Sequence, residues 1–364
     1  MTAWSPAQEK ALTAVARWLK DRDAPQVFRL FGYAGAGKST LARHLAQNVD
    51  GRVVFAAFTG KAALVMRSKG CDNASTIHSL IYRATDSETE EPTFELNEDS
   101  EASRAKLIVI DECSMVDEEL GRDLLSFGRK VLVLGDPAQL PPVKGGGFFT
   151  DGEPDVMLDE VHRQAADNPI IRLSMVVREG GALEPGDYGD TRIVPRAALD
   201  PALVTGADQV LVGINKTRRA YNRRLRELRG FTGELPRSGE KLVCLRNNRK
   251  KGLLNGALFT VKSAGALRRG KVRMLVMPED GEGGLRRVGV IPQFFDGSEG
   301  EIPFALRKDS DEFDYGYALT VHKAQGSQWN DVALFDESFA FREHRARWLY
   351  TGVTRAAQKL TLVV

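Results

Sequence analysis

A glycine-rich segment carries the spacing of a loop that binds nucleotide phosphates: Gly32-Tyr33-Ala34-Gly35-Ala36-Gly37-Lys38-Ser39, followed by Thr40. Glycines let the backbone curl so that successive N–H groups point at phosphate oxygens, and a helix that begins at the lysine adds positive potential. In such a loop Lys38 reaches the β- and γ-phosphates, and the hydroxyl of Ser39 binds Mg²⁺. A glycine turn with a solvated lysine is the alternative, but we predict an ATP and Mg²⁺ site at residues 32–40.

Two carboxylates follow an apolar segment further along the chain. Residues 107–110 are predicted as a strand that ends in Asp111 and Glu112. In a parallel sheet that also holds the glycine loop, the carboxyl end of this strand emerges beside the metal ion. Asp111 would hold the hydrated Mg²⁺, and Glu112 would orient and deprotonate an attacking water. The alternative is a pair of acidic caps for the next helix, but the pair favours phosphoryl transfer to water.

These residues need a parallel α/β framework, and the hydrophobic pattern predicts one. Ser5 and Pro6 indicate the start of a helix whose apolar residues recur at helical spacing. Short apolar segments that alternate with helices are predicted as strands: residues 27–31, 53–58, 107–110, 131–134 and, in the second half, 209–212. Nearly all-apolar strands separated by helices indicate a parallel sheet covered on both faces.

Part of the second half has a different pattern. Four short strand-like segments are separated by glycine-rich turns: residues 242–245, 258–261, 272–277 and 288–291. With Asn255-Gly256 as a hairpin turn, they predict a small antiparallel barrel or sandwich inserted into a second α/β domain. The helical and parallel-strand pattern returns from Tyr317. Residues 180–202 are rich in Gly, Pro and Asp and predict a long irregular connection.

Composition excludes several classes of protein. The 364 residues are 42% hydrophobic and 27% charged, which excludes a disordered or collagen-like chain. No stretch approaches the roughly 18 apolar residues of a membrane span, and the N-terminus lacks the pattern of a secretory signal. Three cysteines and five histidines lack the spacing of zinc ligands. We therefore expect no zinc site, no membrane association and a reducing, cytoplasmic compartment.

The order of the motifs resembles the superfamily 1 helicases, and within them the RecD/Dda-type branch of 5′→3′ DNA translocases. Besides the glycine loop and the Asp-Glu pair, five segments carry the resemblance: TGKAA at residues 59–63, STIHSL at 75–80, LGDPAQLPPV at 134–143, ALTVHKAQGS at 318–327 and YTGVTRA at 350–356. The resemblance covers residues 1–180 and 209–235 and is close in 315–364. Residues 83–104 and 236–314 match only in position.

The resemblance implies further residues around the nucleotide. Gln8 would read the adenine edge with its amide, and Gln139 would sense the γ-phosphate. Arg163 and Arg355 would each bring a guanidinium to that phosphate. Gln328 stands where many relatives have a glutamate that contacts the sugar. The structural alternatives are an exposed first-turn residue for Gln8, a polar turn for Gln139 and surface positions for the arginines.

The resemblance also implies contacts with single-stranded DNA, by Thr59, Lys61, His78, Pro141, Thr320, His322 and Lys323. A hydroxyl, a lysine and free N–H groups at a helix start suit phosphate, whereas a lone histidine such as His78 is often structural. Residues 83–104 carry eight acidic residues and two arginines, an unfavourable charge for a strand-separating hairpin. We still favour Phe94 as the aromatic that meets the first unpaired base, with a place in the hairpin core as the alternative.

The implied fold is α/β, with two RecA-like parallel-sheet domains that each carry an insertion. The first would comprise residues 1–82 and 105–160 with a pin hairpin at 83–104, and the second residues 161–235 and 315–364 with an SH3-like barrel at 236–314. The net charge is only +2, but residues 241–277 contain ten Lys or Arg and no acidic residue, and 215–229 contain seven basic residues and one glutamate. Such stretches usually bind polyanions, so we predict that the barrel holds single-stranded DNA, with a solvated face as the alternative.

The leading hypothesis is an ATP-dependent 5′→3′ DNA helicase that binds single-stranded and forked duplex DNA. A DNA-stimulated translocase that remodels protein–DNA complexes is a second hypothesis, motivated by the acidic insertion. A P-loop small-molecule kinase is a third, but it leaves Gln139 and Arg355 without a role. We expect a monomer in the cytoplasm of a bacterial or phage-infected cell, acting in DNA replication or repair, with single-strand-binding or replication proteins as candidate partners.

Overall fold

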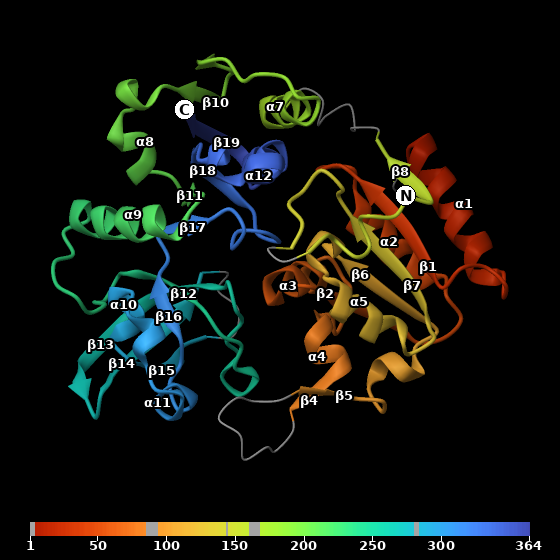
Figure 1. The fold of residues 1–364 in the computed structure, drawn as a ribbon, viewed down its shortest axis with the longest axis horizontal. Helices are drawn as coiled ribbons and strands as arrows, with labels where there is room; N and C mark the ends of the chain where they lie inside the picture. Colours follow the sequence, from red (N-terminus) through yellow and green to blue (C-terminus); the bar gives the residue numbers. More distant parts are fainter. Residues whose placement is uncertain (1–3, 85–93, 143–144, 160–167, 280–283) are drawn as a thin grey trace. The chain divides into compact units, whose positions relative to one another are not determined.

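The computed structural model describes residues 4–84, 94–142, 145–159, 168–279 and 284–364, and its elements are labelled in Figure 1. These residues form two compact units. The first contains the described residues up to Ala182 together with Ala346–Thr354, and the second contains those of Leu183–Arg345 and Arg355–Val364. Residues 169–178 and 346–354, which we expected in the second motor domain, therefore group with the first unit.

A six-stranded sheet with all neighbouring strands parallel forms the centre of the first unit. Its strands follow the order β3-β2-β6-β7-β1-β8. Their bounds are Val27–Gly32 (β1), Val53–Ala57 (β2), Ser75–Thr76 (β3), Leu107–Asp111 (β6), Lys130–Gly135 (β7) and Val156–Leu158 (β8). The strands predicted in this half of the chain are confirmed as β1, β2, β6 and β7.

Helices cover both faces of this sheet. The helices of the unit are Pro6–Lys20 (α1), Lys38–Gln47 (α2), Gly60–Ser68 (α3), Ile77–Ile81 (α4), Glu118–Leu125 (α5) and Pro169–Arg178 (α7), with all but the first residue of Arg345–Val353 (α12). In β6, Leu107 shares a core with α1 and α2, while its neighbour Ile108 shares another with α4 and α5. Because successive side chains of a strand point to opposite faces, two buried faces require strands that are apolar throughout.

A two-stranded antiparallel hairpin lies where we predicted the first insertion. It pairs β4 (Tyr82–Ala84) with β5 (Phe94–Leu96), so that Ala84 lies opposite Phe94. An ion pair of 2.5 Å between Arg83 and Glu95 crosses the two strands. Residues 85–93, which hold half of the insertion's acidic residues, lie outside the described residues.

The second unit has its own sheet, in the order β17-β11-β18-β19-β10-β9, parallel except for the edge strand β9. The strands are Gly186–Asp187 (β9), Thr191–Val194 (β10), Gln209–Val212 (β11), Ala318–Thr320 (β17), Trp329–Phe335 (β18) and Ala356–Val363 (β19). Its helices are Pro201–Thr205 (α8), Asn215–Leu228 (α9), Gln293–Asp296 (α10) and Phe304–Lys308 (α11). The predicted strand at residues 209–212 is confirmed as β11.

The expectation that residues 180–202 are wholly irregular is wrong. Within them, β10 pairs in parallel with Leu360–Val363 at the end of β19, and Thr191 and Ile193 are buried. The strand is only four residues long and lies among Gly, Pro and Asp residues. Unlike β11, it has no continuous apolar run, since an arginine interrupts it, and pairing with the last strand of the chain stabilises it.

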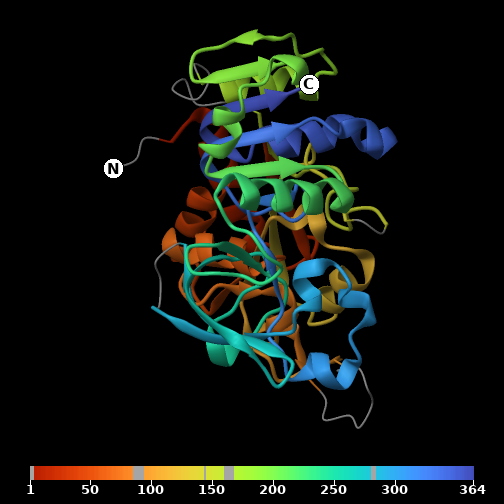
Figure 2. The ribbon, with the colours of Figure 1, turned by 90° about the vertical axis from the view of Figure 1, so that its left-hand side faces the viewer.

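A five-stranded antiparallel sheet in the order β15-β14-β13-β12-β16 completes the second unit. Its strands are Lys241–Cys244 (β12), Leu258–Arg268 (β13), Lys271–Pro278 (β14), Arg286–Val290 (β15) and Phe313–Tyr315 (β16). The four predicted segments are confirmed as β12 to β15. Strands β13 and β14 form a long hairpin (Figure 2) whose two-residue turn, Arg269-Gly270, has φ values of 52° and 73°.

The predicted hairpin turn at Asn255-Gly256 is wrong. These residues immediately precede β13, at the end of the connection 245–257 that also contains a short 3₁₀ helix at Arg249–Lys251. Gly256 does adopt a positive φ of 84° and donates its N–H to the carbonyl of Cys244. An Asn-Gly pair marks a left-handed position, but a two-residue hairpin also needs a strand directly before it.

One continuous core joins the two sheets of the second unit, from Val210 of β11 to Phe259 of β13. A buried ion pair reinforces it: Nε of Arg226 on α9 donates to Oε1 of Glu240 at 2.6 Å. The other oxygen of this fully buried carboxylate accepts from Nη2 of Arg226 and from the N–H of Arg237. Glu240 thereby fixes α9 to the start of the antiparallel sheet.

We expect Glu240→Gln to lower the free energy of unfolding by about 3 kcal/mol, because it leaves the guanidinium of Arg226 buried without its counter-charge. A urea titration followed by circular dichroism measures the change. The matched control is Glu227→Gln, which removes the partner of Arg224 in an exposed pair and should cost less than about 0.5 kcal/mol. Identical unfolding curves for Glu240→Gln and the parent would contradict this role.

Candidate functional site

The glycine-rich segment forms a loop between β1 and α2 in the first unit. Gly35 and Gly37 have left-handed φ values of 81° and 77°, and Gly37 is the N-cap of α2. A Cβ at Gly32 would lie 2.8 Å from Cβ of Leu158, so a side chain there would displace the neighbouring strand. The loop therefore needs glycine at these positions, and it leads directly into a helix N-terminus, as a phosphate site requires.

The ammonium group of Lys38 lies within the curve of this loop. Its Nζ donates to the carbonyl of Gly32 at 2.6 Å and to that of Tyr33 at 3.1 Å. The positive charge of the helix start and that of the lysine thus reinforce each other. Thr40, in the first turn of α2, is exposed.

Ser39, in the first turn of α2, lies beside Asp111, the last residue of β6. The hydroxyl of Ser39 donates to Oδ2 of Asp111 at 2.8 Å, and Oδ1 of Asp111 accepts from the N–H of Glu112 at 2.9 Å. A hydroxyl and a carboxylate are the hard oxygen ligands that Mg²⁺ prefers, so this pair fits the metal. Glu112 has a left-handed φ of 54°, a strained backbone of the kind that clusters at functional sites.

The loop after β7 brings Asp136 and Gln139 to the same edge of the sheet. Asp136 is 2% exposed. Its side-chain Oδ1 accepts a hydrogen bond from the N–H of Ala138, and its backbone carbonyl accepts one from the N–H of Gln139. Gln139 is 6% exposed, and its Oε1 is buried with no hydrogen-bond partner among the described residues. A buried amide oxygen without a partner is costly, and it fits a site where a ligand or a bound water completes the hydrogen bonding.

Two residues of α12 contact these loops. The hydroxyl of Tyr350 donates to Oδ2 of Asp136 at 2.6 Å and accepts from the N–H of Ala34 in the phosphate loop at 3.1 Å. Thr351 Oγ1 accepts from the N–H of Leu140 at 3.0 Å. In this segment we predicted a role only for Arg355, and the signal for Tyr350 and Thr351 was their place in the same motif.

Arg178, at the end of α7, is a second residue that the sequence did not reveal. Its guanidinium carbon lies 3.6 Å from the ring centroid of Tyr33 in the phosphate loop, a cation–π contact. The stack adds positive charge beside a loop that we expect to bind an anion. No local pattern distinguishes this arginine from others on surface helices.

Gln8 is joined to the phosphate loop. Its Nε2 donates to the carbonyl of Ala36 at 3.2 Å, and its Oε1 accepts from the N–H of Ser5, whose hydroxyl in turn accepts from the N–H of Gln8. This reciprocal capping box starts α1, as the Ser5-Pro6 pattern predicted. Gln8 is buried rather than exposed, so the alternative of an ordinary exposed first-turn residue is wrong.

The DNA-contact candidates of the first unit lie at helix starts. Thr59 is the N-cap of α3, and its Oγ1 accepts from the N–H of Ala62 at 3.1 Å. His78 is exposed at the start of α4, and its ring centroid lies 6.3 Å from that of Phe58 and 5.7 Å from that of Tyr82. Desolvation lowers the pKa of His78, despite the carboxylates of Asp117 and Glu119, so its ring is mostly neutral at pH 7.

Lys61 is half-buried in the first turn of α3 and Pro141 is buried, whereas Phe94 at the hairpin is 64% exposed. An exposed aromatic ring at a hairpin is available for base stacking. A buried proline stiffens its loop but offers little surface to DNA. The ring of Phe94 is therefore accessible to a partner, whereas Pro141 exposes little surface.

The candidates of the second unit gather after β17. Oγ1 of Thr320 accepts from the N–H of Lys323 at 3.3 Å, and the ring centroid of His322 lies 5.2 Å from that of Phe341. Desolvation lowers the pKa of His322 and that of Lys323, and the positive charge of Arg218 lowers the latter further. Both side chains are half-buried, and groups whose pKa is shifted by burial are common at functional sites.

Arg355 is buried in the second unit, and its Nη1 donates to the carbonyl of Ser327 at 3.2 Å. Gln328 is exposed next to this contact. Arg163 lies outside the described residues. The structure thus brings Lys38, Ser39, Asp111 and Gln139 together in the first unit, while Arg355 belongs to the second.

The basic stretches of the second unit are partly neutralised. Six of their basic residues form ion pairs with acidic residues elsewhere in the unit: Arg218–Asp314, Arg219–Glu299, Arg226–Glu240, Lys241–Glu279, Arg246–Glu312 and Lys251–Asp311. The residues of the β13–β14 hairpin that stay exposed without an ion pair among the described residues are Lys262, Arg268, Arg269 and Arg273. The positive surface is therefore smaller than the residue count suggested, and this hairpin carries part of it.

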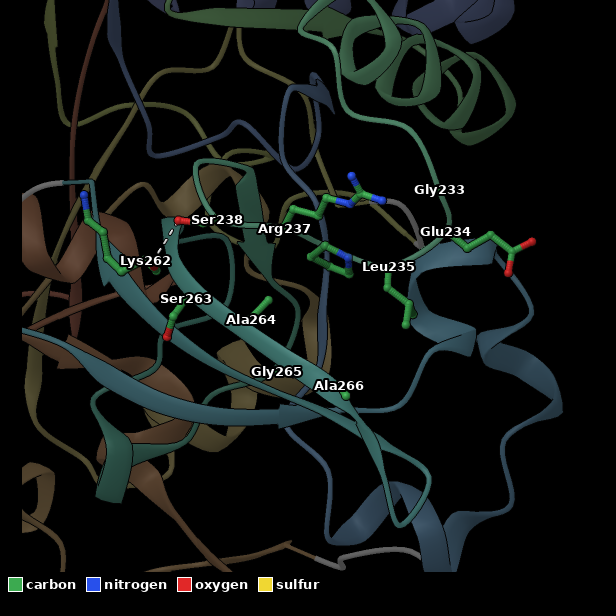
Figure 3. A pocket seen from close by; sticks show the side chains of 11 residues that line it. Gly233, Glu234, Leu235, Arg237, Ser238, Lys262, Ser263, Ala264, Gly265 and Ala266 are labelled. Carbon is green, nitrogen blue, oxygen red and sulfur yellow. Dashed lines mark hydrogen bonds between the residues drawn. The ribbon is translucent and has the colours of Figure 1, made fainter.

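A hollow of about 680 Å³ lies beside the same hairpin (Figure 3). Residues 233–238 line one side and residues 262–266 of β13 the other. The hydroxyl of Ser238 donates to the carbonyl of Lys262 at 2.9 Å and joins the two sides. Arg237 and Lys262 give the hollow positive charge, and none of the residues predicted to bind nucleotide lines it.

The described residues contain no cluster of three or more His, Cys, Asp or Glu side chains that could hold a metal ion. Cys71, Cys113 and Cys244 are buried free thiols. In the described part of the chain, no helix has the length and apolar character that crossing a membrane requires.

Comparison with known proteins gives two matching family models and several relatives. A model described as an AAA domain matches residues 4–192, and one described as a UvrD-like helicase C-terminal domain matches residues 315–363. The chain is 30% identical over 359 residues to an ATP-dependent RecD2 DNA helicase of Deinococcus radiodurans, a match that covers 91% of this chain and 46% of the relative. It is 29% identical over 188 residues to the ATP-dependent DNA helicase dda of Enterobacteria phage T4, covering 48% of this chain and 42% of the relative. The chain thus spans less than half the length of these relatives.

Solved structures of Pif1 helicases share the fold. Bacteroides Pif1 bound to ssDNA matches with a TM-score of 0.62 and 18% identity, covering 100% of this chain and 92% of that chain. Pif1 helicase from Candida albicans matches with a TM-score of 0.60 and 18% identity, covering 100% of this chain and 94% of that chain. The prediction of parallel RecA-like sheets with an added antiparallel sheet is therefore confirmed.

Gln8→Glu should weaken ADP binding by about tenfold, because a carboxylate cannot donate to the carbonyl of Ala36 and so disturbs the phosphate loop. Isothermal titration calorimetry measures the dissociation constant. The control Ser5→Ala removes the hydroxyl that caps α1 but leaves the amide of Gln8 in place, so it should lower stability by about 1 kcal/mol with little change in ADP affinity. Parental ADP affinity in Gln8→Glu would show that the contact with Ala36 does not shape the loop.

Proposed function

Because the chain belongs to the superfamily 1B helicases of the RecD2, Dda and Pif1 type, we propose that it is an ATP-dependent DNA helicase that moves 5′→3′ on single-stranded DNA and separates duplex strands. The observation that carries the proposal is the convergence of Lys38, the Ser39–Asp111 pair and the unpartnered amide of Gln139 at one edge of the first sheet. The names of the relatives, which are ATP-dependent DNA helicases, support both the reaction and the substrate.

ATP is the substrate in this proposal. Lys38 and the N–H groups of the phosphate loop bind its phosphates. Ser39 and Asp111 hold a hydrated Mg²⁺, which supplies charge neutralisation to the phosphoryl group. Glu112 accepts a proton from the attacking water, and Gln139 orients that water against the γ-phosphate.

The remaining nucleotide contacts follow the family motif. Arg355 supplies a guanidinium that neutralises charge on the γ-phosphate; its burial and its contact with Ser327, within the UvrD-like segment, support a fixed position. Arg163 supplies a second guanidinium in this proposal. Gln8 reads the adenine edge, and Gln328 contacts the sugar. Guanidinium groups at the γ-phosphate raise rates by several orders of magnitude.

For DNA, we propose that the helix start at Thr59 and Lys61 and the ring of His78 contact the strand in the first unit, with Pro141 behind them. Thr320, His322 and Lys323 contact it in the second unit. The basic β13–β14 hairpin and the hollow beside it belong to an SH3-like module that holds single-stranded DNA. A Pif1 relative bound to ssDNA and a study of Pif1 unwinding at forked dsDNA support these partners.

The domain division proposed from the sequence is retained: a first motor domain at residues 1–82 and 105–160 with a pin at 83–104, and a second at 161–235 and 315–364 with the module at 236–314. We propose that a monomer suffices, because one chain carries all the residues assigned to ATP. Three buried free thiols are compatible with a reducing cytoplasm, in a bacterial or phage-infected cell. DNA replication or repair, with single-strand-binding or replication proteins as partners, is the setting that we propose.

A strand-displacement assay with 5′-tailed and 3′-tailed duplexes tests the activity and its polarity. We expect the parent to separate the 5′-tailed duplex only, and Lys38→Ala to separate neither while it still binds single-stranded DNA, because the substitution removes the cation at the phosphates. Separation of the 3′-tailed duplex alone would overturn the polarity. Unchanged unwinding by Lys38→Ala would overturn the assignment of the ATP site.

A translocase that remodels protein–DNA complexes without efficient unwinding is the second candidate function. The acidic sequence of the first insertion favours it, because carboxylates such as those of Glu98 and Asp99 repel the phosphates of a fork. ATP hydrolysis that DNA stimulates without any strand displacement would select this function over the first.

The exposed ring of Phe94 separates these two functions. In the helicase, Phe94→Ala should lower the unwinding rate at least about tenfold while ATP hydrolysis stays within about twofold of the parent, because loss of a stacking aromatic costs about 1–3 kcal/mol. Single-turnover unwinding and phosphate release measure the two rates. Phe339→Ala, which removes an equally exposed phenylalanine in the second unit, is the matched control and should leave both unchanged. Parental unwinding by Phe94→Ala would exclude the ring as the separating residue.

A further inference from the structure

The side chains of two consecutive residues on α12 hold the loop that carries Gln139. Tyr350 binds Asp136, three residues before Gln139, and Thr351 binds the N–H of Leu140, directly after it. We propose that Tyr350 and Thr351 are positioning residues for ATP hydrolysis, which fix the Gln139 loop against the phosphate loop. This inference rests on the proposed function and assigns a role to residues of the first unit that none of the expectations covered.

The hydroxyl of Tyr350 bridges the two loops. It donates its one proton to Oδ2 of Asp136 and accepts from the N–H of Ala34, and its side chain is 1% exposed. Desolvation, and then the carboxylate of Asp136, raise the pKa of Tyr350 far above its usual range, so the hydroxyl keeps its proton at any working pH. The direction of both hydrogen bonds is therefore fixed.

Gln139 depends on this bridge because its own side chain does not anchor it. Its Oε1 has no hydrogen-bond partner among the described residues. The aim of the amide is therefore set by the backbone of residues 136–140. Within the loop, the carboxylate of Asp136 accepts a hydrogen bond from the N–H of Ala138, and the carbonyl of Asp136 accepts one from the N–H of Gln139. Tyr350 and Thr351 attach this small turn to α12 at both ends.

Charge gives Tyr350 a second effect. Asp136 is a buried carboxylate that shares the hydroxyl of Tyr350 with the third residue of the phosphate loop, where a polyanion is to bind. A hydrogen bond from the hydroxyl to one of its oxygens stabilises the negative charge of the carboxylate. In Tyr350→Phe this oxygen loses its donor, so we expect both a looser Gln139 and a stronger repulsion of the transferring phosphoryl group.

The test compares conservative substitutions that keep the shape of the side chains. Tyr350→Phe and Thr351→Val each remove the hydrogen bonds, and Thr351→Ser keeps the hydroxyl. We expect the first two to lower kcat for ATP hydrolysis about tenfold with KM changed less than about twofold, and Thr351→Ser to stay close to the parent. The matched control is Tyr315→Phe, which removes a buried tyrosine hydroxyl that donates to the carbonyl of Glu234 in the second unit and should leave kcat unchanged.

Amide hydrogen exchange of the peptide that contains Leu140 provides a readout that does not depend on activity. Exchange at Leu140 should accelerate in Thr351→Val and in Tyr350→Phe, and stay parental in Thr351→Ser and Tyr315→Phe. Parental exchange in both altered variants, or accelerated exchange with parental kcat, would overturn the inference. If the parent protein hydrolyses no ATP, the proposed function is overturned instead. The exchange rates would still show whether Tyr350 and Thr351 fix the Gln139 loop to α12.

Discussion

Parallel pairing of β1, β6 and β7 is the constraint on which the candidate site depends. Parallel strands end at the same edge of a sheet, so the loops that follow Gly32, Asp111 and Gly135 must meet there. The apolar residues of these strands are buried on both faces and cannot move independently of the helices that cover them. The residues that can bind or react with a ligand therefore lie in the loops at the strand ends. The hydrogen bond between Ser39 and Asp111 joins two of these three loops directly.

The third loop is attached in another way, through α12 rather than through the sheet. Buried ion pairs do the corresponding work in the second unit, where Glu240 and Asp314 bind arginines of α9. A buried ion pair adds little net stability, because its attraction only partly offsets the free energy of removing both charges from water. Its main effect is to fix the relative position of the two elements that it joins. The hydrogen bonds of Tyr350 and Thr351 attach α12 to the Gln139 loop, and those of Glu240 attach α9 to the start of the antiparallel sheet.

The sequence predicted what is local. The glycine loop, the Asp-Glu pair and the apolar strands are patterns of a few consecutive residues, and the structure has them where they were expected. It did not predict contacts between distant positions: Tyr350 and Asp136 lie 214 residues apart in the chain. For the same reason a residue count overestimated the free positive charge, since Lys251 pairs with Asp311, 60 residues further on. The three-residue strand β16 forms because β12 pairs with it, and it has too few positions to show a pattern of its own.

A helicase that moves on single-stranded DNA must couple ATP hydrolysis at the phosphate loop to the bound strand, and the rate of phosphate release with and without an oligothymidylate tests this coupling most directly. If DNA contacts assemble the hydrolytic residues, the oligonucleotide should raise kcat at least about 100-fold, because one guanidinium that reaches the γ-phosphate accelerates phosphoryl transfer about 10³-fold or more. A rate that is the same in the presence and absence of DNA would contradict the account and point to a phosphotransferase that works without nucleic acid.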